Sequence, residues 1–192
     1  MAIRRVNKYG DKILRKKTKQ VDYKAIKKEL KSILKDMTDT MEVAGGIGLS
    51  ANQMGLDLKL AIIRYRKSED ESIDIVIINP EIVEQSGAES KDEGCLSLPG
   101  LFSKTKRFTK VKVLALNEKG MPVEMIAEGL LARAFQHEID HLNGILFVDK
   151  LPFISRVKLK PVLKKMKKVW AKIDESSPDY KSPQISEADC EF

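Results

Sequence analysis

Hydrophobic positions along the chain follow first a helical period and then a strand period. Over residues 22–42, apolar residues recur at steps of three and four with lysines between them, which predicts a surface helix packed on a core. Five later runs have the short, apolar composition of strands and are separated by turn residues: 58–65, 73–79, 82–85, 111–116 and 123–127. Their succession favours a mostly antiparallel sheet.

Two further segments have helical periodicity. The first spans residues 128–142 and ends at Asn143 and Gly144, which are typical of a helix C-terminus. The second spans residues 156–172, and Pro161 predicts that its regular part starts or kinks there. Because helices and strands are segregated along the chain, the predicted class is α+β, with mostly antiparallel sheets around a central helix and further helices near both ends.

Length and composition suit a single domain. The chain has 192 residues, of which 42% are hydrophobic and 33% charged. No apolar run reaches the roughly 18 to 20 residues of a membrane span, and the start of the chain lacks an apolar stretch of signal-peptide length. We expect one folded domain over residues 1–172, an acidic flexible tail over residues 173–192, and a cytoplasmic location in preference to an organelle.

Basic residues gather near the two ends of the chain. The net charge is +7, and the segment 156–172 holds eight basic residues and no acidic ones. Residues 1–35 are also strongly basic, whereas the middle of the chain is acidic. Such runs are typical of solvated helix faces, and a polyanionic partner is the alternative interpretation.

Both histidines of the chain lie in one predicted helix, with Glu138 directly after His137. Four residues separate His137 from His141, which places two imidazoles one turn apart on the same face, as binding one metal ion requires. Two nitrogens leave the ligand set incomplete. Cys95, between predicted strands, is the favoured third ligand, because Cys190 lies in the expected tail.

A site with one thiolate and two imidazoles leaves a fourth coordination position open, which is typical of catalytic metal sites. A divalent ion can lower the pKa of a bound water from 15.7 to roughly 7. Glu138, next to a ligand but not itself one, is then the candidate proton acceptor and donor. These residues predict metal-dependent hydrolysis, and they suit iron(II) and zinc equally.

Three motifs in this order resemble those of the peptide deformylases: residues 46–53 (GIGLSANQ), 93–97 (EGCLS) and 136–141 (QHEIDH). The similarity covers about residues 3–170 and also includes residues 13–15, 129–133 and 142–144. The third motif alone occurs in many metalloproteases. The three together are highly specific.

The resemblance implies an enzyme that removes the formyl group from the N-terminal methionine of nascent bacterial-type polypeptides and releases formate. It implies one divalent metal ion, Fe²⁺ in the first place with Zn²⁺, Ni²⁺ or Co²⁺ also able to bind, held by Cys95, His137 and His141. It assigns acid–base catalysis to Glu138. Residues 1–172 would then form a catalytic domain around a central metal-binding helix.

Gln53 and the backbone N–H of Leu96 are the candidates for stabilising an oxyanion. A neutral amide donor stabilises developing negative charge without competing for the metal, and the resemblance assigns this role to both positions. Gly46 and Gly48 follow a helix and lack the three-glycine dinucleotide spacing, so no nucleotide cofactor is expected.

Further residues are candidates for substrate binding. By similarity, the glycines at 46 and 48 let the backbone approach an extended peptide, which would pair with it as an added strand. The methionine side chain would enter an apolar pocket, for which the reasonable walls are Ile47, Leu130 and Ala134. Ordinary core packing accounts for these three apolar residues equally well.

The sequence departs from the commonest family pattern at Ser50, where Ala is usual, and has Asn52 at the variable position before the conserved glutamine. A hydroxyl at position 50 needs a partner if it is buried, and we expect activity to be retained. In bacterial members of the family a C-terminal helix contacts the ribosome. The basic helix over 156–172 is therefore a candidate for binding ribosomal RNA phosphates.

Two other functions fit part of the pattern. A metallopeptidase that cleaves internal bonds would share the His-Glu-x-x-His motif, but the chain lacks the third ligand typical of such enzymes. A ribosome- or RNA-binding module with a vestigial metal site would explain the basic ends. The intact set of Gln53, Cys95 and Glu138 argues against loss of the chemistry. No membrane partner is expected.

Overall fold

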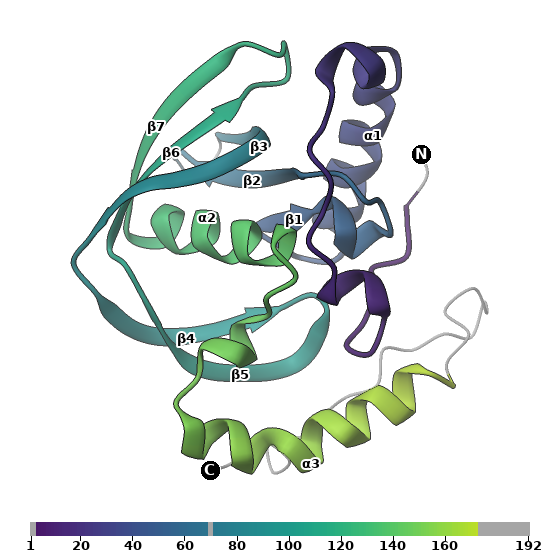
Figure 1. Ribbon diagram of the computed structural model, residues 1–192, viewed down its shortest axis with the longest axis vertical. Coiled ribbons are helices and arrows are strands. Elements are labelled where there is room, and N and C mark those ends of the chain that lie inside the picture. The colour runs from purple at the N-terminus through teal and green to yellow at the C-terminus, as the bar shows by residue number, and fades with distance from the viewer. Residues whose placement is uncertain (1–2, 69–70, 173–192) are drawn as a thin grey trace.

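The structure, a computed structural model, describes residues 3–68 and 71–172 (Figure 1). Within these residues it confirms the predicted α+β class, with three α-helices, a five-stranded sheet and a two-stranded sheet, each with antiparallel neighbours. The expected tail over residues 173–192, with Cys190, lies outside the described residues.

The helices follow the prediction closely, with one exception. Helix α1 (Tyr23–Val43) begins after Asp22, whose side chain accepts hydrogen bonds from two backbone N–H groups. Helix α2 (Gly129–Leu142) ends as predicted, with Gly144 at φ +75°. Helix α3 (Phe153–Trp170) begins earlier than predicted and runs through Pro161.

The prediction that the C-terminal helix could start at Pro161 is therefore wrong. The reason is packing on both sides of the proline: Leu159, Met166 and Trp170 are all buried in one cluster. Burial of this face stabilises a continuous helix despite the hydrogen bond that a proline removes.

The main sheet has the order β1 (Gly48–Ser50), β2 (Leu60–Arg66), β3 (Ser72–Ser86), β6 (Lys110–Leu116) and β7 (Pro122–Glu128). The predicted strands at 73–79 and 82–85 are parts of one strand, β3. Asn79 has a positive φ of 54° and the pairing shifts register between Ile78 and Glu81, which interrupts the alternation of polar and apolar residues. Strand β1 is only three residues long and was not predicted.

The second sheet pairs β4 (Glu89–Cys95) with β5 (Leu98–Arg107) and was also not predicted. Strand β4 is polar along its length, and Glu93 is its one buried residue. Because the apolar alternation that marks a strand is absent there, only pairing with β5 reveals it.

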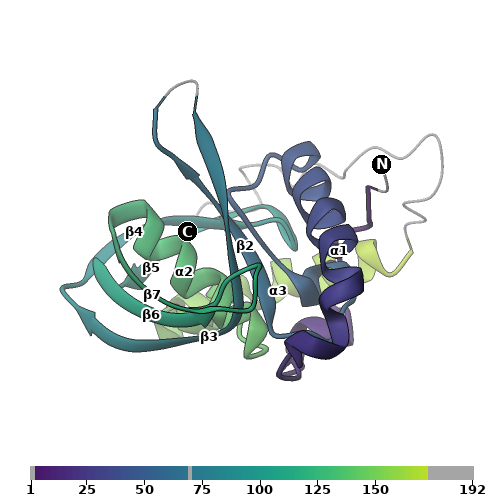
Figure 2. The same ribbon diagram turned by 90° about the horizontal axis from the view of Figure 1, so that it is seen from above.

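Helix α2 lies between the two sheets, as Figure 1 shows. Alternate residues of β2 face opposite sides: Ala61 and Ile63 pack in the cluster that includes α2, whereas Leu60 and Ile62 pack in the cluster that includes α1. The two helices therefore lie on opposite sides of β2 (Figure 2). The histidine helix is the central helix of the fold, as predicted.

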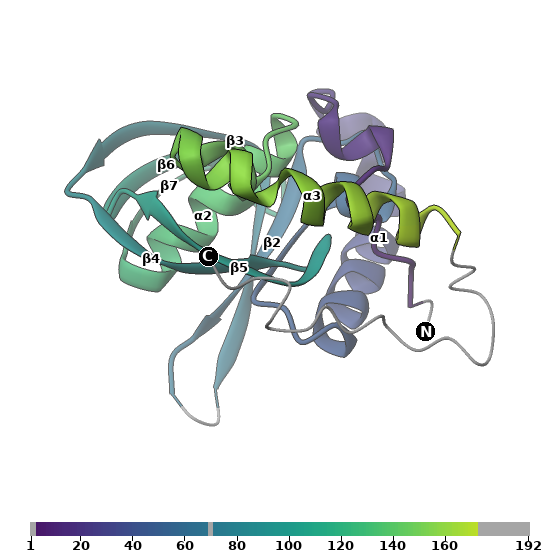
Figure 3. The ribbon, with the colours of Figure 1, turned by 90° about the horizontal axis from the view of Figure 1, so that it is seen from below.

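Helix α3 packs across the outside of the second sheet (Figure 3). Its buried residues belong to one packed cluster with Leu98 and Leu101 of β5, the short helix η3 (Phe147–Lys150), and Leu14 of the short helix η1 (Lys12–Arg15). None of the helices over residues 3–68 and 71–172 is both long and apolar enough to cross a membrane.

Candidate metal centre and active site

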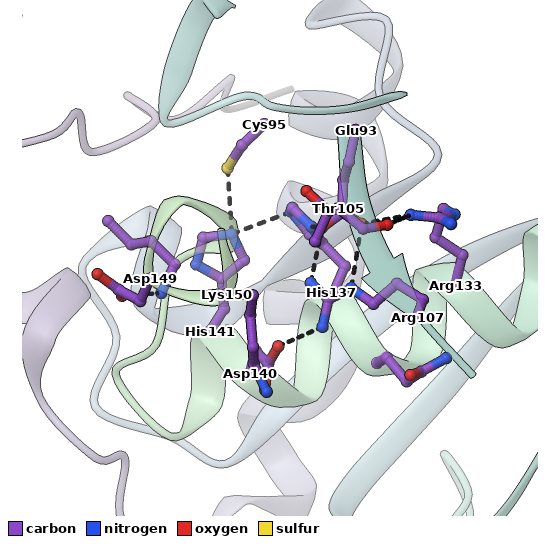
Figure 4. Close-up of polar contacts among 12 residues, drawn as sticks. Glu93, Cys95, Thr105, Arg107, Arg133, His137, Asp140, His141, Asp149 and Lys150 are labelled. Atoms are coloured by element: carbon purple, nitrogen blue, oxygen red, sulfur yellow. Dashed lines mark hydrogen bonds and ion pairs between the residues drawn. The ribbon is translucent and has the colours of Figure 1, made fainter. Parts of the chain in front are cut away.

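The three predicted metal ligands lie together although they come from different elements. His137 and His141 project from the same face of α2, and their Nε2 atoms are 3.2 Å apart. Cys95 is the last residue of β4, and its Sγ lies 3.1 Å from Nε2 of His141 (Figure 4). The ligand atoms of all three residues lie within 4.8 Å of one another.

The charges of this cluster suit a cation. Burial raises the pKa of the Cys95 thiol, but the charges and hydrogen bonds of His141 and His137 outweigh burial and hold this pKa well below its usual range. Burial lowers the pKa of His137, but its bonds to Cys95 and Glu93 raise it well above the usual range. The thiolate beside two imidazoles therefore favours positive charge at this place, whether as a proton on His137 or as a bound metal ion.

The residues therefore fit a divalent metal ion. A thiolate and two imidazoles supply three soft or borderline ligands, and the two nitrogens that face each other at 3.2 Å are close enough for both to bind one ion. Oε2 of Glu138 is buried and has no hydrogen-bond partner among the described residues. A polar ligand on the metal would satisfy that oxygen.

Glu138 occupies the interior beside the metal ligands. The residue is 3% exposed, and burial raises the pKa of its carboxyl above the ordinary value. A Cβ added at Gly48 would collide with Oε1 of Glu138, so the carboxyl lies directly against the β1 backbone. Glycine at this position thus leaves room for the proposed acid–base residue.

Gln53 lies in the short helix η2 (Ala51–Met54) and is 1% exposed. Its Nε2 donates to Oγ of Ser97 at 3.0 Å and lies 3.7 Å from Sγ of Cys95. The structure therefore places the predicted amide donor beside the predicted metal ligand. Leu96 follows that ligand directly and lies with Gln53 on the wall of one pocket.

That pocket has a volume of about 710 Å³ and a mostly apolar lining. All five predicted substrate-binding residues line it: Gly46, Ile47, Gly48, Leu130 and Ala134. Cys95, His137 and Glu138 also line it, whereas His141 is 1% exposed and is not part of the lining. The fold thus brings the predicted site residues together at one pocket and the cluster directly beside it.

Sequence reasoning missed a buried ionic network behind the metal ligands. Glu93 accepts a hydrogen bond from Nδ1 of His137 at 2.7 Å and bonds from Arg107 at 2.6 and 3.0 Å and from Arg133 at 2.9 Å (Figure 4). Arg107 also pairs with Asp140. Burial raises the pKa of Glu93, but these bonds outweigh it and hold that pKa far below the usual range.

The network orients the metal site. With Nδ1 of His137 bonded to Glu93, Nε2 of the ring is the nitrogen that faces the cluster. The place of Glu93 in the second motif, two residues before the cysteine, was a signal for this role. No such signal marked Arg107, because it ends a basic run with Lys104 and Lys106, and such runs are typical of solvent-exposed residues.

Comparison with known proteins agrees with this geometry. The family model described as Polypeptide deformylase matches residues 3–157. A peptide deformylase of Elusimicrobium minutum is 47% identical over 176 residues, which are 89% of this chain and 100% of the relative. One from Aquifex aeolicus is 51% identical over 144 residues, 74% of this chain and 84% of the relative.

Solved structures agree with the sequence relatives. A peptide deformylase from Legionella pneumophila superposes with a TM-score of 0.78 at 43% identity, covering 90% of this chain and 100% of the other. The enzyme from Synechococcus elongatus, solved with actinonin, gives 0.74 at 40% identity and covers 84% of each chain. Sequence, fold and ligand cluster agree, and the chain belongs to the polypeptide deformylase family.

Proposed function

We propose that the chain hydrolyses the formyl amide of N-formylmethionyl peptides at one metal ion held by Cys95, His137 and His141. The observation that supports this most strongly is that Cys95, His137, Glu138 and Gln53 line a single, mostly apolar pocket, with His141 clustered with the other two ligands. A thiolate, two imidazoles and an adjacent buried carboxyl are the groups that metal-assisted hydrolysis requires.

The roles of the side chains follow from their positions. An ion in this site would supply a water whose pKa is lowered to roughly 7. Glu138 accepts a proton from the attacking water and donates it to the departing amine as the carbon–nitrogen bond breaks and formate leaves. Gln53 Nε2 and the backbone N–H of Leu96 donate to the carbonyl oxygen as it gains negative charge.

The pocket suits a methionine side chain followed by an extended peptide. Gly46 and Gly48 leave the backbone accessible for pairing with the substrate. Ile47 and Leu130 are 48% and 66% exposed at the pocket, so they offer apolar surface that the free protein leaves uncovered. Ala134, which is smaller and buried, leaves depth beside the metal helix.

We propose iron(II) as the metal, with zinc, nickel or cobalt able to replace it. Ligand chemistry alone does not separate iron from zinc, and the preference rests on family resemblance. We place the activity in the cytoplasm and in one catalytic domain over residues 1–172, with residues 173–192 as an appended acidic tail.

One assay tests the reaction and the metal together. Protein purified without oxygen is expected to hold about one iron per chain and to release formate from formyl-Met-Ala-Ser. The unblocked peptide Met-Ala-Ser is expected to remain intact, which separates deformylation from peptidase activity. Absence of formate release from metal-loaded protein would overturn the proposed function.

The outer face of α3 supports a second proposal, contact with ribosomal RNA. Lys160, Lys164 and Lys168 are exposed and recur at four-residue steps, so they form one basic stripe. The opposite face of the helix is buried in the core. Deleting the helix would therefore damage the fold, and charge reversal is the cleaner test.

Reversing the charge of Lys160, Lys164 and Lys168 to Glu is expected to reduce co-sedimentation with ribosomes, with the largest effect at low salt, because phosphate contacts release counterions. The matched control reverses three exposed lysines of α1, Lys24, Lys27 and Lys31, which changes net charge equally. Equal binding by both variants and the unmodified chain would exclude α3 as the contact.

A further inference from the structure

Ser50 carries a buried hydroxyl that the proposed reaction does not use. The residue is 0% exposed and is the N-cap of η2. Its Oγ lies 2.9 Å from Oε1 of Gln53, and its backbone N–H donates to the same oxygen at 3.0 Å. The hydroxyl expected to need a partner therefore has one, and that partner is the candidate oxyanion donor.

These two bonds determine which way the Gln53 amide points. A backbone N–H can only donate, so the atom that faces Ser50 must be the amide oxygen. The NH₂ group is then directed the other way, toward Oγ of Ser97 at 3.0 Å and Sγ of Cys95 at 3.7 Å. Gln53 is thus fixed at its carbonyl end and presents its donor to the metal ligands.

We propose that Ser50 is a positioning residue for deformylation, whose hydroxyl holds the Gln53 amide so that Nε2 faces the place where the formyl oxygen becomes negative. This inference rests on the proposed function. Terminal amide torsions are broad, and without the hydroxyl one bond at the oxygen and one at the nitrogen would hold the amide less tightly. A second donor to the same oxygen narrows that motion, and preorganised donors stabilise a transition state more than mobile ones do.

The Ser50 hydroxyl has a second neighbour. Burial raises the pKa of Glu138, and a hydrogen bond from Ser50 partly offsets this effect. The hydroxyl has one proton, and the 2.9 Å contact directs it to Gln53. Action through Glu138 is therefore the competing explanation, and the experiment must separate the two.

A double-mutant cycle separates them, with formate release from metal-loaded protein as the readout. Gln53→Ala is expected to lower kcat by about 10² to 10³-fold, as for loss of one oxyanion donor. Ser50→Ala is expected to lower kcat by about 5- to 10-fold with KM unchanged, because the hydroxyl acts on the transition state. The double variant is expected to match Gln53→Ala alone.

Matched measurements keep the outcome interpretable. Thr40→Val removes another buried hydroxyl, on α1, and is expected to leave kcat unchanged. If Ser50→Ala lowers the melting temperature, Ser50→Cys keeps the shape with only a weak donor and serves in its place. Metal content is measured for every variant.

A Ser50→Ala effect that persists in the Gln53→Ala background, or that shifts the acid limb of the kcat/KM profile, would overturn the inference, since it would place the hydroxyl's action elsewhere. If the unmodified chain is active and the effects of the two substitutions are additive, only the inference about Ser50 is refuted, and the proposed function stands. An unmodified chain that releases no formate would refute the proposed function as well.

Discussion

Replacing Glu138 with Gln is expected to lower kcat for formate release by about 10² to 10⁴-fold, the range for loss of a positioned acid–base group. The amide has the shape of the carboxyl but cannot accept and return a proton. Because Glu138 is not among the clustered ligands, metal content is expected to stay near that of the unmodified chain. Formate kinetics and metal analysis on the same preparation measure both effects.

The thermal stability of this variant is a useful internal check. Burial raises the pKa of Glu138, so its charged form is disfavoured where it lies and a neutral amide there is expected to be tolerated. Glu128→Gln, at the exposed start of the same helix, is the matched control and is expected to keep full activity. A Glu138→Gln protein that is metal-loaded, folded and fully active would refute the assigned role.

Replacing Glu93 with Gln is expected to have the largest effect on stability, about 3 to 5 kcal/mol in the free energy of unfolding. The carboxylate is the shared partner of Arg107 and Arg133, and the side chains of all three are 8% exposed or less. Removing its charge leaves two buried guanidinium groups without the negative charge that pairs with both of them. Denaturant unfolding of the two proteins gives the difference.

The same substitution is expected to weaken metal binding by about 10- to 100-fold, since Glu93 orients the His137 ring through Nδ1. The control is Glu84→Gln in β3, which removes an exposed ion-pair partner of Lys112. It is expected to change neither unfolding nor metal affinity appreciably. Unchanged unfolding and metal affinity in Glu93→Gln would show that the network is dispensable.

The stability difference should also depend on pH. The folded-state pKa of Glu93 lies well below the ordinary value of 4.5, so its contribution is fully present above pH 4.5 and is lost as the pH falls through the folded-state pKa. The gap in melting temperature between the unmodified chain and Glu93→Gln is therefore expected to narrow in strong acid. A gap that widens would contradict the assigned charge state.

The local sequence pattern predicted the helices more completely than the strands. The boundaries of α1 and α2 differ from the predicted ones by at most one residue, because apolar spacing and capping residues act within a few positions of each helix end. Strand β4 could not be found in this way. Its residues are polar, and its pairing with β5 depends on a partner strand rather than on its own composition.

By itself the sequence predicted the helical histidine pair and Cys95 as its partner in a metal site, and it carried the motifs that mark the family. These follow from the fixed spacing of a helix and from the scarcity of soft ligands in the chain. Only the tertiary structure decided which buried charges support the site. Glu93 of β4, Arg107 of β5 and Asp140 of α2 come from three different elements, and they meet only where α2 lies against the second sheet, a place where an unpaired charge is costly.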